Sequence, residues 1–481
     1  MGRKPKAKKK PATKKKIIQK PAKGWSASGR KKTVQKKKTI RKPKAAKQEV
    51  KEEPKIKIRT PKLLRGFKDI LPKEQKYWYY IINKAEALAW GYGFGRIDTP
   101  ILESTDLFIR TIGKQTDIVE KEMFSFEDQG GDNVTLRPEG TASIARAYIE
   151  HGMLNLPQPV RLFYYGPMFR YERPQAGRYR EHHQIGFEIL GDASAVIDSQ
   201  LIILAYNFCK ELGLDINIQI NSIGCLECRS EYKTELINYL RSKRNSLCEN
   251  CKKRLNKNPL RVLDCKEESC IKVIEDAPQT VDWLCDDCKN HFVKVLEYLD
   301  EVEVPYMLNP RLVRGLDYYN RTVFEIWSNE GDNTARQSAF GGGGRYDMLI
   351  SSLGGRETPS CGFSLGVERL ILKLKEKEIE IEDPTKPQIF LAQLGEAAKR
   401  KALVLFEELR RNNIRVAESF AKDSLRQQLE FANKLGVKVT LILGQKEVMD
   451  GTILVRDMEG GIQEVVDFNK ILEEIKKRLE L

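Results

Sequence analysis

Residues 169–184 read Phe169-Arg170-Tyr171-Glu172-Arg173-Pro174-Gln175-Ala176-Gly177-Arg178-Tyr179-Arg180-Glu181-His182-His183-Gln184. Two apparent strands flank a loop at 173–180, which contains the turn formers proline and glycine. Four arginines fall within eleven residues, and the planar donor fork of arginine fits a phosphate in two-point contact. The pattern predicts a β-hairpin that binds a nucleoside triphosphate, although a solvated basic hairpin explains the charges alone nearly as well.

Alternating, aromatic-rich segments on both sides of this hairpin predict a mainly antiparallel sheet. They span residues 134–139, 160–172, 181–190 and 322–327. Before them, a helix is expected from Pro72 to Gly91, followed by a strand that carries Pro100. The apolar face of this helix is expected to hold Tyr77, Ile81, Ala85 and Leu88.

The C-terminal part alternates between strand and helix patterns, which is typical of an α/β domain. The expected elements are strand 388–393, helix 397–411, strand 414–418, helix 424–435 and strand 437–443. The sequence thus predicts an α+β chain in three parts. They are a tail at 1–60, an antiparallel-sheet domain at 61–385 with a helical insertion at about 222–305, and an α/β domain at 386–481.

Positive charge is concentrated in the first 60 residues. They hold 25 Lys and Arg against three Glu, a net +22, whereas the remainder holds 59 positive and 64 negative residues. The tail has few apolar side chains, and burying them would not compensate for the conformational entropy lost on ordering. We therefore expect the tail to be disordered. It is either a solubilising or targeting tail, or an arm that binds nucleic acid without reading its sequence. No membrane span or signal peptide is expected, which favours a cytoplasmic protein.

Eight of the ten cysteines occur in close pairs within the insertion, and the other two, Cys209 and Cys361, are expected to be core thiols. The pairs are Cys225-x-x-Cys228, Cys248-x-x-Cys251, Cys265-x₄-Cys270 and Cys285-x-x-Cys288. In a reducing compartment such spacing favours structural Zn²⁺ over disulfides. Eight thiolates suffice for two tetrahedral sites, although one site, or a group of buried free thiols, also fits the spacing.

Three further segments combine charge, rings and glycine. Residues 312–322 place Arg314 beside Tyr318 and Tyr319, a mixture that can hold an anion next to a planar ring. Residues 339–347 contain four consecutive glycines, which permit close backbone approach to a ligand or form a flexible loop. Residues 362–370 run from a short strand into an amphipathic helix whose first turn carries Glu368 and Arg369.

Together these segments resemble a known family. Arg170 in Phe-Arg-x-Glu is similar to motif 2 of the class II aminoacyl-tRNA synthetases, Gly366-x-Glu368-Arg369 to motif 3, and Pro100 after its helix to motif 1. Within that class, residues 314–319 and 341–347 resemble the two histidine-specific motifs of histidyl-tRNA synthetases. The resemblance covers about residues 62–481. It implies a catalytic domain followed by an anticodon-binding domain, and a homodimer through motif 1.

The resemblance also implies a reaction: histidine is activated with ATP and then transferred to histidine tRNA. The implied histidine pocket comprises Glu139, Gly140, Thr141, Gln184, Glu188, Arg314, Tyr318 and Tyr319. Glu139 and Thr141, joined by Gln184, would bind the α-amino group, as suits a carboxylate and a hydroxyl. Glu188 and Tyr319 would contact the imidazole, with Tyr318 beside them, because hydrogen bonds at both ring nitrogens can reject isosteres.

The implied nucleotide site comprises Arg170, Arg178, Tyr179 and Arg369, with Mg²⁺ accompanying ATP. Arg170 would bind the α-phosphate and Arg314 would stabilise the charge that develops there, so that Arg314, Arg170 and Gln184 form the catalytic set. Gln175 and Arg180 are expected to contact the acceptor end of the tRNA.

Two other functions are compatible with parts of the sequence. One is a regulatory subunit of ATP phosphoribosyltransferase on the same catalytic fold, and the other is a non-catalytic RNA-binding or stress-sensing module. Regulatory relatives of this kind usually lack the anticodon domain and part of the ligand set, both of which are present here. The combination of Glu139, Arg170, Arg314 and Arg369 argues against the RNA-binding module.

Overall fold

The computed structural model describes residues 60–329 and 339–480, and the tail prediction therefore lies outside the described residues. Its centre is an eight-stranded sheet. In spatial order the strands are β1 (Gly95–Arg96), β5 (Val160–Phe169), β6 (Glu181–Leu190), β11 (Ser360–Gly366), β10 (Ala339–Arg345), β9 (Asn320–Ser328), β7 (Ile216–Ser222) and β8 (Tyr306–Leu308). Only the outermost pairs, β1 with β5 and β7 with β8, are parallel. The predicted antiparallel sheet is confirmed.

The hairpin β5–β6 pairs ten residues on each strand, from Val160 opposite Leu190 to Phe169 opposite Glu181. Strand β6 has the predicted bounds, but β5 ends at Phe169, so Arg170 lies just past the strand. The glycine run is not a flexible loop but the central strand β10, paired on both sides. Glycines have no side chains to pack, so this stretch would be a weak strand by itself. Hydrogen bonds to the strands on both sides stabilise it.

One face of the sheet is covered by α1 (Pro72–Gly91), α4 (Ala195–Glu211) and α10 (Val367–Glu376), which share a core with the odd-numbered residues of β6. Helix α1 has the predicted ends, but its buried stripe is Trp78, Ile81, Ala85 and Ala89. Pro100 is not in a strand. It lies between β1 and β2 (Leu102–Ser104), where its missing N–H breaks no ladder.

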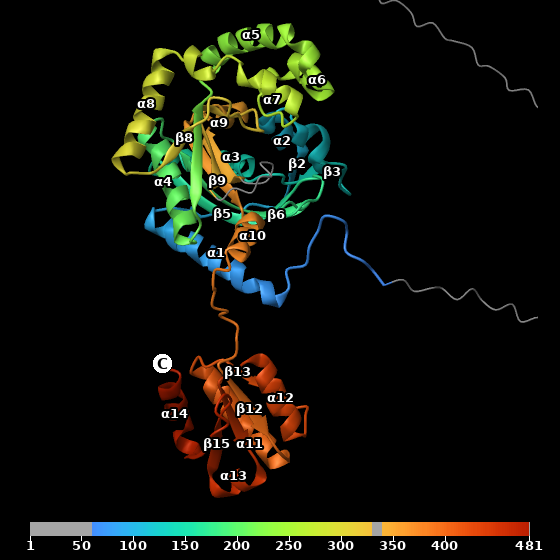
Figure 1. The fold of residues 1–481 in the computed structure, drawn as a ribbon, viewed down its shortest axis with the longest axis vertical. Coiled ribbons are helices and arrows are strands. Elements are labelled where there is room, and N and C mark those ends of the chain that lie inside the picture. The colour runs from blue at the N-terminus through green and yellow to red at the C-terminus, as the bar shows by residue number, and fades with distance from the viewer. Residues whose placement is uncertain (1–59, 330–338, 481) are drawn as a thin grey trace, which may run out of the picture. The chain divides into compact units, whose positions relative to one another are not determined.

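The opposite face carries α3 (Thr141–Glu150) and most of the helical insertion, which share a second core with Tyr164 of β5. The last helix of the insertion, residues 286–301, packs in the first core instead. The insertion leaves the sheet after β7 and returns at β8 (Figure 1). Its helices are α5 (Leu226–Ser242), α6 (Glu249–Lys257), α7 (Glu268–Glu275) and α8 (Asp286–Glu301). Beside them lie α2 (Thr105–Ile112), the π-helical turn η1 (Ile118–Glu122), the short helix α9 (Leu349–Ser352) and a small sheet of β2, β4 (Asn133–Leu136) and β3 (Phe124–Glu127).

The C-terminal residues form a separate five-stranded sheet with its own core. Its strands, in spatial order, are β13 (Val416–Glu418), β12 (Ile389–Gln393), β14 (Val439–Leu443), β15 (Thr452–Asp457) and β16 (Gln463–Asp467). The helices are α11 (Glu396–Arg411), α12 (Leu425–Leu435), α13 (Gln445–Asp450) and α14 (Ile471–Arg478). The first three strands are parallel, as the alternation predicted, whereas the antiparallel β15 and β16 were not predicted.

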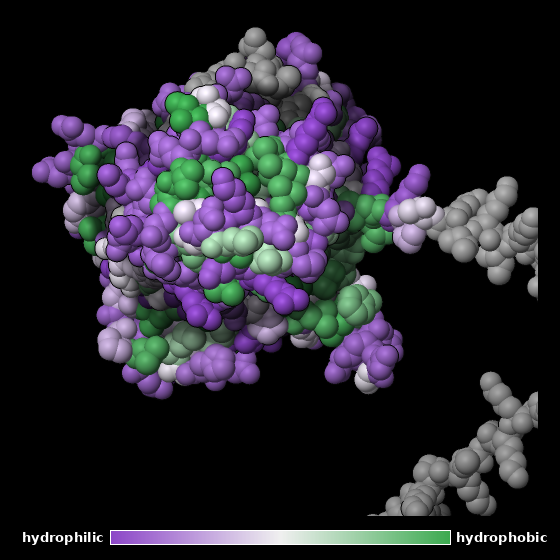
Figure 2. All heavy atoms as spheres, turned by 90° about the horizontal axis from the view of Figure 1, so that it is seen from below, coloured by the Kyte–Doolittle hydropathy of each residue, from purple (hydrophilic) through white to green (hydrophobic). Residues whose placement is uncertain are grey.

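The surface seen in Figure 2 is largely hydrophilic, and its apolar areas are broken up by polar side chains. Among the described residues, no helix has both the length and the apolar character that a membrane crossing requires.

Candidate active site

A buried carboxylate, Glu188, lies on the face of β6 opposite the α1–α4–α10 core, between a hydroxyl group and a phenol. Thr141 Oγ1 donates to its Oε1 over 2.7 Å, and the Tyr346 hydroxyl donates to its Oε2. Burial raises the pKa of Glu188 to about 8, although both hydrogen bonds favour its ionised form. The group is therefore protonated in a large fraction of molecules at neutral pH.

Glu139 occupies the N-terminus of α3. Its carboxylate accepts the backbone N–H groups of Thr141 and Ala142 at 2.7 and 2.8 Å, and Gly140 is the N-cap residue. Burial raises the pKa of Glu139, while the two N–H groups and the helix dipole oppose this by stabilising negative charge. Thr141 connects this carboxylate to Glu188, so the two acids belong to one buried, hydrogen-bonded cluster, named the acidic pocket below.

Three tyrosine rings cluster beside the two acids. The ring centroids of Tyr318 and Tyr319 are 4.6 Å apart, and Tyr346 lies 5.6 and 6.4 Å from them. Gln184 also lies on this face of β6, and within the described part of the chain its Oε1 has no hydrogen-bond partner. Tyr346 was not predicted as a site residue, although its place in the 341–347 motif was the signal that could have identified it.

Arg314 lies at the edge of the tyrosine cluster. Its Nη1 donates to Glu325 Oε1 over 2.5 Å, and its Cζ is 5.5 Å from the Tyr319 ring centroid. Burial disfavours the charged guanidinium, but Glu325 outweighs it and raises the pKa of Arg314. A Cβ at Gly342 would lie 2.3 Å from the backbone oxygen of Phe324 and 2.8 Å from Arg314 Nη1, so this strand position has no room for a side chain.

Three more guanidinium groups, Arg170, Arg178 and Arg369, lie close enough to repel one another. Burial, followed by the charge of Arg178 and then of Arg170, lowers the pKa of Arg369 to about 10. Arg170 is fixed by its Nε–H donating to Pro138 O over 2.8 Å and by its backbone N–H bonding to Arg180 O over 2.9 Å. Such a positive cluster would be stabilised by a bound polyanion.

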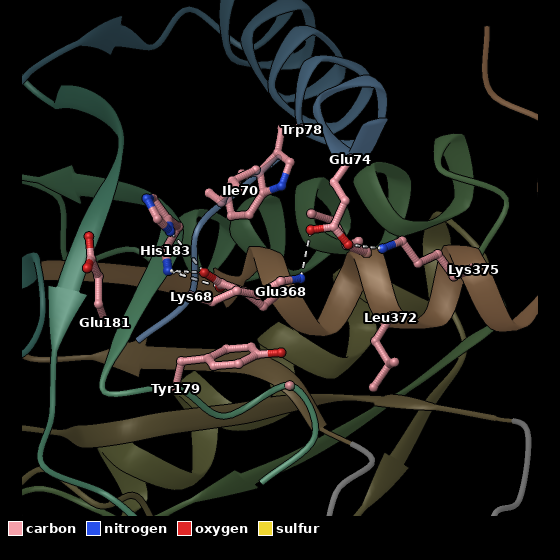
Figure 3. Close-up of a pocket in the computed structure, with 12 residues that line it drawn as sticks. Lys68, Ile70, Glu74, Trp78, Tyr179, Glu181, His183, Glu368, Leu372 and Lys375 are labelled. Atoms are coloured by element: carbon pink, nitrogen blue, oxygen red, sulfur yellow. Dashed lines mark hydrogen bonds and ion pairs between the residues drawn. The ribbon is translucent and has the colours of Figure 1, made fainter. Parts of the chain in front are cut away.

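The hairpin tip between the arginines is a two-residue turn, closed by reciprocal backbone hydrogen bonds between Gln175 and Arg178 at 3.1 and 3.0 Å. Arg180 lies over the Tyr171 ring, 3.5 Å from Cζ to centroid. Tyr179 lines a separate pocket with His183, Glu368 and Lys375 (Figure 3).

The cysteines of the insertion form two groups. Cys225, Cys228, Cys285 and Cys288 make up the first, and Cys248, Cys251, Cys265 and Cys270 the second. Within each group all four sulfur atoms lie within 4.8 Å of one another, so each could hold a metal ion. None of the ten cysteines, all of which lie in the described residues, forms a disulfide, and Cys209 and Cys361 are buried as expected.

A family model described as Histidyl-tRNA synthetase matches residues 66–370, which include the acidic pocket and the arginine cluster. The chain belongs to the histidyl-tRNA synthetase family. A second model, Anticodon binding domain, matches residues 388–478. The histidine–tRNA ligase of Dehalococcoides mccartyi strain 195 is 48% identical over 417 residues, covering 86% of this chain and 99% of the relative. That of Thermosipho melanesiensis is 47% identical over 403 residues, covering 84% and 95%.

Solved structures agree with the sequence relatives. The apo histidyl-tRNA synthetase of S. aureus superimposes with a TM-score of 0.74 at 35% identity, covering 87% of this chain and all of that one. An ATP phosphoribosyltransferase regulatory subunit/histidyl-tRNA synthetase from Bacillus halodurans has a TM-score of 0.58 at 21% identity, covering 79% and 97%, and shows the fold alone.

As a histidyl-tRNA synthetase, the chain is an aminoacyl-tRNA ligase with the class II α+β fold. It activates L-histidine with ATP to histidyl-adenylate and pyrophosphate, and then transfers histidine to the 3′ end of histidine tRNA.

Proposed function

We propose that the acidic pocket binds histidine. Glu139, Thr141 and Gln184 take the α-amino group, and Gly140 keeps the backbone close to it. Glu188 and Tyr319 hold the imidazole, with Tyr318 beside them. The observation that supports this assignment is the buried Thr141–Glu188 hydrogen bond, because it brings the proposed ligand of the α-amino group next to the proposed ligand of the imidazole. In this proposal, the hydrogen bonds from Glu188 and Tyr319 to the imidazole reject amino acids of similar shape.

The arginine cluster binds ATP in this proposal. Arg170 takes the α-phosphate, and Arg178 and Arg369 take the outer phosphates. Tyr179 belongs to the nucleotide set as the hairpin neighbour of Arg178. The depressed pKa of Arg369 supports the assignment, since burial and the charges of Arg178 and Arg170 disfavour its positive charge, and a bound triphosphate would stabilise that charge.

Activation then needs no protein nucleophile. The histidine carboxylate attacks the α-phosphate, the bond to pyrophosphate breaks, and Arg314 and Arg170 stabilise the charge that develops on the α-phosphate oxygens. Mg²⁺ bound to ATP neutralises the outer phosphates. Carboxylates suit this ion, and Glu172 and Glu325, which already pair with Arg178 and Arg314, are the residues that would hold it.

The remaining assignments concern tRNA and assembly. Gln175 and Arg180 at the hairpin contact the acceptor end, and the domain at 386–481 binds the anticodon. The resemblance of the segment around Pro100 to motif 1 supports a homodimer. The protein acts in the cytoplasm, and its basic tail binds nucleic acid non-specifically.

We also propose that the eight clustered cysteines bind structural Zn²⁺. Four sulfur atoms within 4.8 Å of one another match the space around a tetrahedral ion, whose bonds to sulfur are about 2.3 Å long. The tertiary grouping supports two sites rather than one.

Arg314→Ala tests the proposed chemistry. The substitution removes a fixed positive charge from the reacting phosphate, so histidine-dependent pyrophosphate exchange is expected to fall about 100-fold or more. Arg311→Ala, which removes an exposed arginine three residues earlier, is the matched control and should retain normal exchange. A loss below tenfold in Arg314→Ala would reject the role of Arg314.

A further inference from the structure

Each of the three Cys-x-x-Cys pairs begins a helix of the insertion. Cys225, Cys248 and Cys285 are the N-cap residues of α5, α6 and α8, and the second cysteine of each pair follows in the first turn. The first cluster therefore joins the beginning of α5, where the insertion leaves the sheet domain, to the beginning of α8. The second cluster joins α6 to α7.

The first cluster lies next to the residues that end the histidine-specific loop 314–319. Gly224, directly before Cys225, has φ of +67°, and a Cβ there would lie 2.6 Å from the Cys228 Cβ. Its carbonyl accepts the Arg321 N–H at 2.9 Å. Arg229, directly after Cys228, donates its Nη2–H to the carbonyl oxygen of Tyr319. The orientation of the first turn of α5 thus determines where Tyr319 is held.

The segment between the two cysteine pairs of the second cluster contacts other residues of the same loop. Within this segment, Asn258 donates to Asp317 Oδ1 and Arg261 Nη1 donates to Gly315 O, both over 2.9 Å. Arg261 Nη2 also reaches Asp117 Oδ2 at 2.9 Å, which fixes this segment against the sheet domain.

Residues 312–319 contain no helix or strand of their own, so contacts from outside hold them in place. Besides the contacts from the insertion, the Asp317 N–H donates to Ile112 O at 3.1 Å and Asn221 donates to Leu312 O at 3.0 Å. We infer that the two Cys₄ clusters bind one Zn²⁺ each, and that the insertion held by these ions positions the histidine-specific loop through Arg229, Asn258 and Arg261. The inference rests on the proposed zinc binding and on the proposed histidine pocket. Arg229, Asn258 and Arg261 are positioning residues, because they act through backbone carbonyls and a side chain of the loop.

Metal content tests the first half of the inference. Full-length protein purified without a histidine tag should contain two zinc ions per chain by elemental analysis. Cys228→Ser and Cys251→Ser should each lose one ion, because they lie in different clusters. Cys209→Ala removes a buried thiol outside both clusters and should keep two. A wild-type content of one ion or none, or the loss of both ions from a single substitution, would overturn the two-site assignment.

Arg229→Ala tests the second half without touching a ligand, so it remains informative if the cysteine variants fail to fold. The Michaelis constant for histidine in pyrophosphate exchange should rise at least tenfold, while that for ATP and the zinc content stay near wild-type values. Arg229→Lys, which can still donate to the Tyr319 carbonyl, should recover most of the loss. Arg241→Ala, at the far end of the same helix, is the control and should match wild type.

The outcomes separate the proposals. An unchanged Michaelis constant for histidine in Arg229→Ala overturns the positioning role even if two zinc ions are present. Equal losses for histidine and ATP indicate a general structural defect and overturn it as well. A normal rate of pyrophosphate exchange in Arg314→Ala would refute the proposed catalytic chemistry, but it would not affect the assignment of the two zinc sites.

Discussion

At the scale of single residues, the most unusual group of the site is the carboxyl of Glu188. It is fully enclosed, and burial raises its pKa from 4.5 to about 8. A protonated carboxyl can donate a hydrogen bond as well as accept one, whereas a carboxylate can only accept. In the proposed histidine complex, Glu188 can therefore present either a donor or an acceptor to a ring nitrogen of the imidazole, depending on whether this proton is present.

Glu188 also makes folding stability depend on pH. Between about pH 4.5 and about pH 8 the folded chain retains a proton that the unfolded chain has released, so its contribution to the free energy of unfolding falls as pH rises. Glu188→Gln has no such proton. In urea denaturation over this range, the free energy of unfolding of the wild type should fall with rising pH, by up to about 1.4 kcal/mol per pH unit more than that of the variant. Glu297→Gln, an exposed glutamate of α8, controls for the loss of a carboxyl, and parallel curves for wild type and Glu188→Gln would contradict the assignment.

Sequence could suggest most of these residues but not their surroundings. Glu139, Thr141 and Glu188 were expected from the resemblance, whereas the Thr141–Glu188 hydrogen bond joins residues 47 positions apart and depends on how α3 packs against β6. The same holds for Tyr346, whose partner Glu188 is 158 positions away. Local patterns specify strands and turns, but not which side chains face each other across a fold.

At the scale of secondary-structure elements, Glu368 connects the start of α10 to β6. Its two carboxylate oxygens accept the backbone N–H of His183 at 3.0 and 2.9 Å, and Oε1 lies 2.9 Å from the His183 Nδ1 (Figure 3). Nearby, Glu74 of α1 pairs with Lys68 at 2.8 Å and with Lys375 at 2.7 Å. Helices α1 and α10 are thereby joined to each other and to the strand that carries Gln184 and Glu188.

Removing the Glu368 carboxylate should loosen this junction. Glu368→Ala leaves the His183 N–H without its acceptor in a largely buried position, which is expected to lower the free energy of unfolding by about 1–3 kcal/mol in urea denaturation. Glu368→Gln keeps one acceptor oxygen, so its free energy of unfolding should fall less. Glu376→Ala, at the exposed end of the same helix, should match the wild type, and an equal loss in both alanine variants would contradict the local explanation.

Element bounds were predictable where periodicity and turn residues agree, and less so elsewhere. Helix α1 and strand β6 have the expected ends. The glycine run gave no periodicity to interpret, because its strand conformation is imposed by β9 and β11 on either side. Strand β16 was missed because exposed side chains dominate it, so it lacks an apolar alternation. Strand β15 does alternate between buried and half-buried residues, and was nevertheless not predicted.

At the scale of the whole molecule, charge is divided unequally along the chain. Residues 1–60 carry a net +22, whereas the remaining residues carry a net −5. A folded body of negative net charge repels tRNA at long range, which limits the rate and strength of encounter. The tail therefore supplies the electrostatic attraction in our proposal, while the hairpin and the anticodon-binding domain supply specificity.

Deleting residues 1–58 should weaken tRNA binding in a salt-dependent manner. Each phosphate that the tail neutralises releases condensed counterions and adds about 0.7–0.9 to the slope of log affinity against log salt. The truncated protein should thus have a slope shallower by several units. Its affinity should be at least tenfold lower at low salt and converge with the full-length value at high salt.

A full-length variant with tail lysines replaced by glutamine separates charge from length, and it should behave like the deletion. Unchanged affinity and slope in the deletion would reject the nucleic-acid role of the tail, and full-length behaviour in the glutamine variant would show that charge is not its cause.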